Sequence, residues 1–111
     1  MIDNSLEIKS PTVANLEITE ICNVKCKHCY NPWRDESMGI NELDLIKIQK
    51  VLKQLKEMGV FHVILSGGEP MSNFKVLKAA MKILNEQKMT FSCNTNLILA
   101  DDKKMKELKN L

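Results

Sequence analysis

Three cysteines lie close together near the N-terminus of the chain. Cys22, Cys26 and Cys29 follow the spacing Cys-x3-Cys-x2-Cys within what reads as one short loop. Thiolates held this close together can bind a metal ion or an iron–sulfur cluster. A four-iron cluster with only three protein thiolates has one iron left open, and an open iron can bind a small ligand directly. The spacing therefore favours a cluster that can do chemistry as well as carry electrons.

A structural zinc site is the alternative that the cysteines alone leave open, with His28 or a distant group as the fourth ligand. Zinc sites usually combine two pairs of ligands, and the chain has no second pair of cysteines. Cys93 is the remaining cysteine, and it alternates with Ser92 and Asn94 in an expected strand. We interpret it as a small buried hydrophobic residue and not as a ligand.

A glycine-rich loop is the second feature that could do chemistry. It reads Ser-Gly-Gly-Glu-Pro from Ser66 to Pro70, and a turn of this kind is a weak signal when it stands alone. Gly67 and Gly68 would let a ligand approach the backbone, and Glu69 offers an anionic acceptor for an ammonium group. Pro70 removes a backbone donor and stiffens the exit of the loop.

Hydrophobic periodicity indicates which elements position these loops. Strands are expected over residues 13–21, 60–65 and 89–95, and helices from an N-cap at Asn41 to Met58, over 73–87 and after Asp101 or Asp102. Asp44 would then stand at the third helical position, as in a capping box. Three strand–helix repeats predict an α/β fold with a parallel sheet or a partial barrel.

The three expected strands place their following loops at one edge of the sheet. The cysteine loop follows the first strand, the glycine loop follows the second, and Asn94-Thr95-Asn96 ends the third. Parallel α/β folds gather their ligands at the carboxyl ends of the strands. We therefore expect all three loops to contribute to one site.

The amino-acid composition argues against several classes of function. The 111 residues are 44% hydrophobic, enough for the core of one small domain or of part of a larger one. The formal net charge is only +2, with basic and acidic residues interleaved, which argues against nucleic acid as a partner. No apolar run approaches the length of a membrane span, and there is no signal-peptide pattern. Clustered, metal-spaced thiols favour a reducing cytoplasm over a disulfide scaffold.

The cysteine motif and the Gly-Gly-Glu-Pro motif, in this order and at this distance, resemble the N-terminal half of a radical S-adenosylmethionine (radical SAM) domain. The resemblance covers residues 13–111, the expected N-terminal part of a radical SAM core domain, and leaves residues 1–12 as a tail or an edge segment. It implies about three βα units of a (βα)6-type partial barrel. We expect the chain to be part of a larger protein or a truncated product, because three units leave a sheet edge uncovered.

The resemblance also implies a cofactor set and its ligands. In that family three cysteines hold a [4Fe–4S] cluster, and S-adenosylmethionine (SAM) chelates the open iron through its amino and carboxylate groups. The glycine–glutamate loop contacts the amino group, the residue before the third cysteine lies near the adenine, and polar residues ending the third strand help hold the ligand. The implied metal ligands are Cys22, Cys26 and Cys29, and the implied cofactor-binding residues are His28, Gly67, Gly68, Glu69, Pro70, Asn94 and Asn96.

The activity implied by the resemblance is reductive cleavage of SAM to methionine and a 5′-deoxyadenosyl radical, which abstracts hydrogen from a substrate. We expect a peptide or protein substrate and an electron donor of the flavodoxin or ferredoxin type. Two alternatives stay open from the sequence. One is an activating enzyme that installs a glycyl radical on a partner, and the other is a non-catalytic zinc- or iron–sulfur-binding module.

Overall fold

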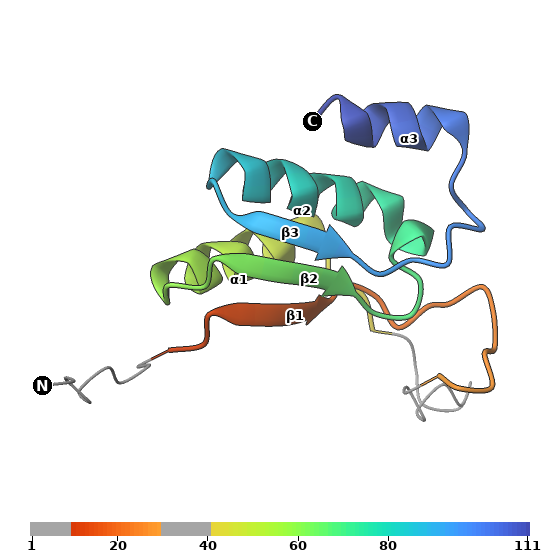
Figure 1. The fold of residues 1–111 in the computed structure, drawn as a ribbon, viewed down its shortest axis with the longest axis horizontal. Coiled ribbons are helices and arrows are strands. Elements are labelled where there is room, and N and C mark those ends of the chain that lie inside the picture. The colour runs from red at the N-terminus through yellow and green to blue at the C-terminus, as the bar shows by residue number, and fades with distance from the viewer. Residues whose placement is uncertain (1–9, 30–40) are drawn as a thin grey trace, which may run out of the picture.

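The computed structural model of the chain describes residues 10–29 and 41–111. Within them, three strands form one parallel sheet in the order β1-β2-β3, and a helix follows each strand (Figure 1). The strands are β1 (Val13–Glu17), β2 (His62–Ser66) and β3 (Thr90–Cys93). The helices are α1 (Leu45–Glu57), α2 (Phe74–Glu86) and α3 (Asp102–Lys109), with a short 3-10 helix, η2 (Pro70–Asn73), before α2.

The register of the sheet brings the three strand ends together. Glu17 of β1 pairs with Ser66 of β2, and Leu65 of β2 pairs with Cys93 of β3. All three arrowheads in Figure 1 therefore point to the same edge, where the cysteine loop, the glycine loop and the segment after β3 leave the sheet. This is the edge at which parallel sheets bind ligands.

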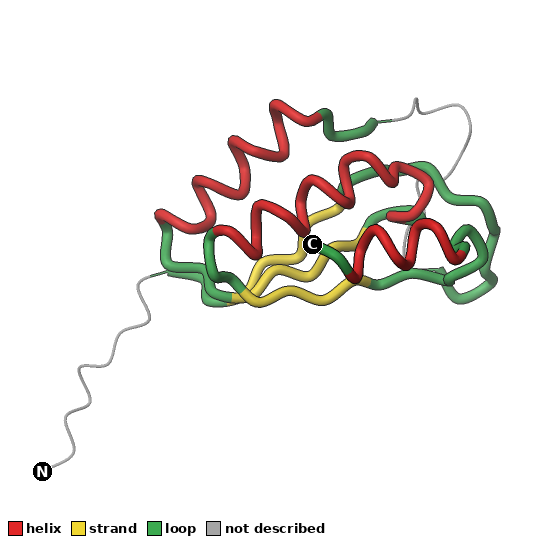
Figure 2. The backbone as a smooth tube through the Cα atoms, turned by 90° about the horizontal axis from the view of Figure 1, so that it is seen from above, coloured by secondary structure: helices red, strands yellow, loops and turns green. Residues whose placement is uncertain are grey.

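The core lies between the sheet and two helices. Helices α1 and α2 cover the same face of the sheet, as Figure 2 shows. Val63 and Leu65 of β2 are fully buried on that face, against Leu52 of α1 and Leu77 of α2. The buried positions of α1 and α2 recur at helical spacing, which is why these segments form amphipathic helices. None of the helices in the described residues is both long enough and apolar enough to cross a membrane.

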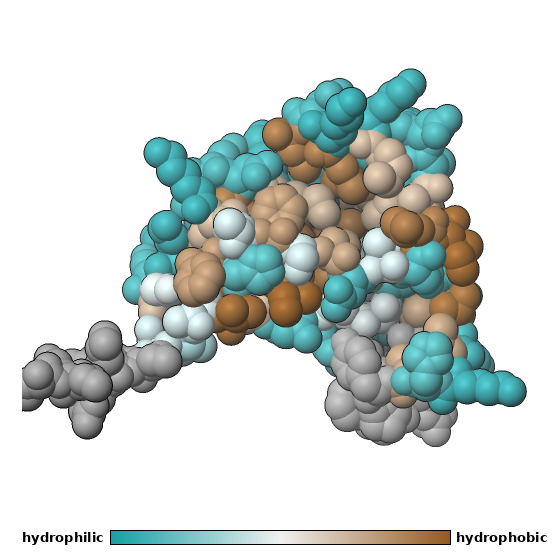
Figure 3. All heavy atoms as spheres, viewed as in Figure 1, coloured by the Kyte–Doolittle hydropathy of each residue, from teal (hydrophilic) through white to brown (hydrophobic). Residues whose placement is uncertain are grey.

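The opposite face of the sheet is more polar. His62 in the middle strand lies 2.8 Å from the Thr90 hydroxyl through Nδ1 and 3.3 Å from the Ser92 hydroxyl through Nε2. The Ser66 hydroxyl donates to the side-chain oxygen of Asn15 on β1. These pairs join neighbouring strands, and they satisfy polar groups on a face that none of the helices in residues 10–29 and 41–111 covers. Away from the sheet, hydrophilic side chains dominate the upper rim of the molecule in Figure 3, where Figure 1 places α3.

The predicted start of the first helix is wrong. Asn41 does not cap α1; the N-cap is Asp44, whose Oδ1 accepts from the Lys47 N–H at 2.7 Å. The backbone N–H of Asn41 instead donates to the Glu20 carboxylate at 3.0 Å, and the Glu20 N–H donates to the Asn41 carbonyl at 3.0 Å. This pairing holds Asn41 against Glu20 and outside the helix, so the N-cap lies three residues later than a local capping pattern predicts.

The predicted strands match the observed ones in number and order but not in their ends. The first strand was expected to reach Ile21 but ends at Glu17, because Thr19 forms an antiparallel bridge with Glu42 instead of continuing the ladder. The expected strands 60–65 and 89–95 are observed as His62–Ser66 and Thr90–Cys93. The third helix is capped by Asp101, one of the two residues predicted for its start.

The packing of α1 predicts a sharp contrast between two isoleucines on the same helix. Ile48 is fully buried, whereas Ile46 is 77% exposed. Ile48→Ala should lower the free energy of unfolding by about 2–5 kcal/mol, because it removes buried methyl groups and leaves a cavity. The matched Ile46→Ala variant should change it by less than about 0.5 kcal/mol. Chemical denaturation followed by circular dichroism measures both, and equal losses would contradict the buried face assigned to α1.

Candidate functional site

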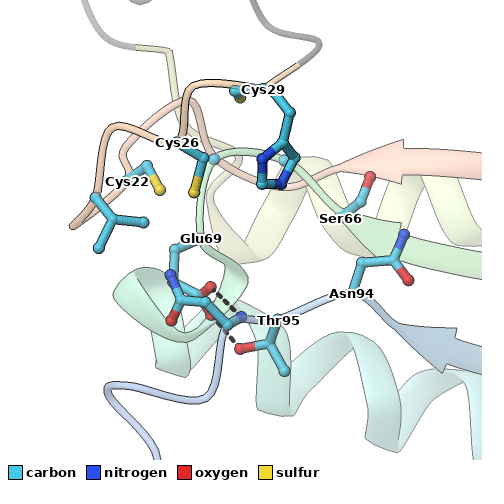
Figure 4. Close-up of a pocket in the computed structure, with 12 residues that line it drawn as sticks. Cys22, Cys26, Cys29, Ser66, Glu69, Asn94 and Thr95 are labelled. Atoms are coloured by element: carbon cyan, nitrogen blue, oxygen red, sulfur yellow. Dashed lines mark hydrogen bonds between the residues drawn. The ribbon is translucent and has the colours of Figure 1, made fainter.

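A pocket of about 330 Å³ lies at the carboxyl edge of the sheet (Figure 4). Three loops line it, and each follows a different strand. The cysteine loop contributes Cys22, Val24, Cys26, His28 and Cys29; the glycine loop and the strand end before it contribute Ser66, Gly67, Gly68 and Glu69; the segment after β3 contributes Asn94, Thr95 and Asn96.

Every predicted site residue except Pro70 lines this pocket. Pro70 is buried and begins η2, so it shapes the loop from behind. Val24, Ser66 and Thr95 also line the pocket, although the sequence did not single them out as ligands. The sequence signal that could have found Thr95 was its position between Asn94 and Asn96. The ligand roles of all these residues remain predictions.

All three cysteines of the loop line the pocket, and two of their thiols point the same way. Figure 4 shows the thiols of Cys22 and Cys26 pointing into the same region, with Cys29 further along the loop. The Cys29 N–H donates to the Cys26 carbonyl at 3.2 Å, so these two cysteines share one tight turn. In residues 10–29 and 41–111, no three His, Cys, Asp or Glu side chains form a ready-made metal site. Metal binding commonly completes the geometry of such a loop, because it couples to local folding.

The cysteine loop is closed at its base by contacts between its two ends. The Thr19 hydroxyl donates to Glu42 Oε1 at 3.0 Å and accepts from the Ile21 N–H at 3.0 Å. Asn41 pairs with Glu20 through both backbone and side chain. Thr19 is only 2% exposed, so this clasp is partly buried. It fixes where the loop leaves the sheet and where it returns to α1.

The two glycines are required by the chain itself. A Cβ atom on Gly67 would lie 2.3 Å from the Thr19 carbonyl oxygen, and one on Gly68 would lie 2.1 Å from the Ile21 carbonyl oxygen. Both contacts are far too close for real atoms, and the φ angle of +134° at Gly67 also favours glycine. We predicted that these glycines let a ligand approach the backbone. The structure adds a different reason, which is that the segment after β1 crosses directly against the loop.

Glu69 is turned into the protein. The residue is only 2% exposed, and its carboxylate accepts three hydrogen bonds. Oε1 accepts from the Met71 N–H at 3.0 Å and from the Thr95 hydroxyl, while Oε2 accepts from the Asn96 N–H at 2.9 Å (Figure 4). Charge-assisted bonds of this kind are about twice as strong as neutral ones. The carboxylate therefore ties the glycine loop to the segment after β3.

Cys93 differs in chemistry from the three loop cysteines. It packs against the core on β3 and does not line the pocket. Burial, and secondly the negative charge of Glu69, raises the pKa of the Cys93 thiol to about 11. The thiol is therefore protonated at neutral pH, whereas a metal ligand must be a thiolate. This agrees with its interpretation as a small hydrophobic residue.

A comparison with models of protein families shows to which family this chain belongs. The model of the radical SAM superfamily matches residues 16–111, which include all three pocket loops. The chain belongs to the radical SAM superfamily. This confirms the prediction made from the two motifs, and it also confirms the α/β fold class, since three strands alternating with helices are consistent with a partial radical SAM (βα) barrel.

Curated relatives of this radical SAM chain carry the names of two cyclases. A probable GTP 3′,8-cyclase of Methanococcus maripaludis is 35% identical over 86 residues, which are 78% of this chain and 28% of that protein. A PqqA peptide cyclase of Bradyrhizobium diazoefficiens is 34% identical over 98 residues, 88% of this chain and 25% of that protein. Another, of Gluconobacter oxydans, is 31% identical over 104 residues, 93% of this chain and 28% of that protein. The chain thus spans about a quarter of the length of these relatives.

The raised pKa of Cys93 predicts the order in which the cysteines react. In metal-free protein at pH 8, a thiol of pKa about 11 is only about 0.1% thiolate, so iodoacetamide should modify Cys93 far more slowly than the exposed Cys26. The rate at Cys93 should rise about tenfold per pH unit from pH 8 to pH 10, because the thiolate is the nucleophile. Peptide mass spectrometry measures both rates. In denaturant the difference should disappear, and its persistence there would contradict an origin in burial.

Proposed function

We propose that the pocket holds a [4Fe–4S] cluster on Cys22, Cys26 and Cys29 together with one molecule of SAM. The observation that supports this most is the convergence of three loops on one pocket at the carboxyl edge of the sheet, in a chain of the radical SAM superfamily. Thiolate is the ligand that iron–sulfur clusters use, and the cysteine loop supplies three. Cys93 would not compete for iron, because it is half-buried on β3, does not line the pocket and has a raised thiol pKa.

The rest of the pocket is lined by amide and hydroxyl side chains and by the imidazole of His28. A volume of about 330 Å³ is at the lower end of the range for small-molecule sites, which is about 300–1,000 Å³. In this proposal the backbone of the loop from Gly67 to Pro70 receives the amino acid end of SAM, and Asn94 and Asn96 supply amide groups beside it. His28, which is exposed on the cysteine loop, would stack near the adenine.

When bound, the cluster would supply the electron that cleaves SAM to methionine and a 5′-deoxyadenosyl radical, which takes a hydrogen atom from the substrate. The residues of this chain would ligate, orient and shield these cofactors. The clasp between Thr19 and Glu42 would hold the base of the cysteine loop, and the glycine loop would close the pocket beneath it. The electron would come from a flavodoxin- or ferredoxin-type donor in the cytoplasm.

For the substrate we propose a peptide or a protein. Relatives named as PqqA peptide cyclases match 88% and 93% of this chain, whereas a relative named as a probable GTP 3′,8-cyclase matches 78%. The greater coverage favours the peptide, and GTP is the second candidate because its relative has the slightly higher identity of 35%. A glycyl radical activating enzyme and a non-catalytic zinc- or iron–sulfur-binding module are the alternatives, and the experiments below would reveal the module.

Anaerobic reconstitution with iron and sulfide should separate the ligand cysteines from Cys93. The wild-type protein should gain broad charge-transfer absorbance in the visible blue, and Cys26→Ala should lose it, because the cluster would keep only two protein thiolates. The matched Cys93→Ala variant should keep the absorbance, since Cys93 does not line the pocket. Tight, colourless zinc binding by the wild type, with no cluster, would favour the zinc module instead.

The complete, cluster-loaded protein should release 5′-deoxyadenosine when it is given dithionite and SAM, because reductive cleavage needs only the reduced cluster and bound SAM. Liquid chromatography measures the product, and Cys26→Ala should release none. Addition of the peptide substrate should increase the release, whereas GTP should not. An increase with GTP alone would contradict the peptide assignment, and no release from the loaded wild type would contradict the enzyme proposal.

A further inference from the structure

Asn96 makes contacts with both of the other pocket loops. Its backbone N–H donates to Glu69 Oε2 at 2.9 Å, and its side-chain amide nitrogen donates to Asn23 Oδ1 at 2.9 Å. Its side-chain oxygen accepts from the Ile98 N–H at 3.0 Å. Asn23 belongs to the cysteine loop and lies 73 positions before Asn96, and Glu69 belongs to the glycine loop and lies 27 positions before it. One residue of the third loop therefore joins the other two loops.

The orientation of the Asn96 amide is determined by these partners. Because the Ile98 N–H requires an acceptor, the amide oxygen must face it, and the amide nitrogen must then face Asn23. Asn23 is next to Cys22 in the sequence, and the Cys22 thiol lies 4.0 Å from the same Asn23 oxygen that Asn96 contacts. The hydrogen-bonded chain therefore ends beside a proposed cluster ligand.

The hydrogen-bonded chain is firmly anchored at its other end, which is Glu69. Glu69 is 2% exposed, and besides Asn96 its carboxylate holds the Met71 N–H and the Thr95 hydroxyl. Hydrogen bonds are stronger in such a low-dielectric environment, and a carboxylate with three donors has little freedom to turn. The bond between Asn23 and Asn96 is exposed and would be weak alone, but here it connects to a fixed point.

We propose that Glu69, Asn96 and Asn23 form a hydrogen-bonded chain that positions the cysteine loop against the other two loops of the pocket. In this assignment Glu69 is a positioning residue that acts through Asn96, and its carboxylate is not the group that receives the ammonium of SAM. The consequences for cofactors rest on the proposed function. The hydrogen-bonded chain itself belongs to the protein alone and can be tested without any cofactor.

Hydrogen exchange in the metal-free protein tests the hydrogen-bonded chain directly. Asn23→Ala and Asn96→Ala should each speed exchange of the amides from Cys22 to Cys29 by about fivefold, as expected when one ordinary hydrogen bond is lost. The double variant should be no faster than Asn96→Ala alone, because the bond between Asn96 and Asn23 can be lost only once, although Asn96→Ala also removes the acceptor of the Ile98 N–H. Asn85→Ala, at an exposed position of α2, is the matched control and should leave the rate unchanged. Effects that multiply in the double variant would overturn the proposal.

Glu69 and Thr95 distinguish positioning from direct ligand binding. Glu69→Gln should speed exchange of the cysteine loop in metal-free protein, because one of the three donors loses its acceptor. Thr95→Val, which removes the hydroxyl donor but keeps the shape, should have a smaller effect in the same direction, and Thr95→Ser should restore the wild-type rate. If Glu69→Gln weakens SAM binding but leaves exchange of the cysteine loop unchanged, the carboxylate is a direct ligand and the proposal is wrong.

A second measurement uses the cluster-loaded protein. Asn23→Ala and Asn96→Ala should lose iron to a chelator about tenfold faster than the wild type, since partners of the first ligand shell commonly change metal affinity by about 10–100-fold. An unchanged rate of iron loss in both variants would show that the hydrogen-bonded chain does not position the cluster ligands. If the wild type binds no cluster at all, the proposed function fails, but the exchange experiment still decides whether the three residues act as one unit.

Discussion

The pocket depends on close backbone contact between the segment after β1 and the glycine loop after β2. Two short hydrogen bonds join them, from the Gly68 N–H to the Thr19 carbonyl and from the Glu69 N–H to the Ile21 carbonyl, both at 2.7 Å. There is no room for a side chain at Gly68, so this approach specifies glycine. Because the contact lies immediately before Cys22, it fixes the start of the cysteine loop relative to the second loop.

A single buried carboxylate then adds the third loop. Glu69 follows the close contact directly in the sequence, and its side chain turns to the segment after β3, where it accepts from Thr95 and Asn96. Removing an acceptor from a buried donor costs about 1–3 kcal/mol, so such a group strongly favours one arrangement of its neighbours. The parallel sheet brings the three loops to one edge, and these local contacts convert that proximity into a defined pocket.

The fold could be predicted from sequence because its signals are local and periodic. Alternating apolar positions and helical stripes predicted the strands and the main helices in the right order, and Asp101, the observed cap of the third helix, was one of the two residues expected at its start. Asn41 was misread because its true partner, Glu20, lies 21 positions away and competes with capping. The contacts of the two glycines and of Glu69 were missed for the same reason. Their types were noticed, but the backbone and side-chain groups they contact are set by tertiary structure and leave no local pattern.

The four cysteines lie in two different environments, which give their thiols different reactivity. Cys22, Cys26 and Cys29 lie on a loop that opens to the pocket, where a thiolate can meet a metal ion. Cys93 lies one strand away on the covered side of the sheet, and burial together with the charge of Glu69 keeps it protonated. Glu69 thus acts in two directions, since its hydrogen bonds organise the pocket while its charge disfavours a competing thiolate behind it. A glutamine at this position would keep one acceptor oxygen but lose the other and the charge, which gives a physical reason for an acid between the glycines and Pro70.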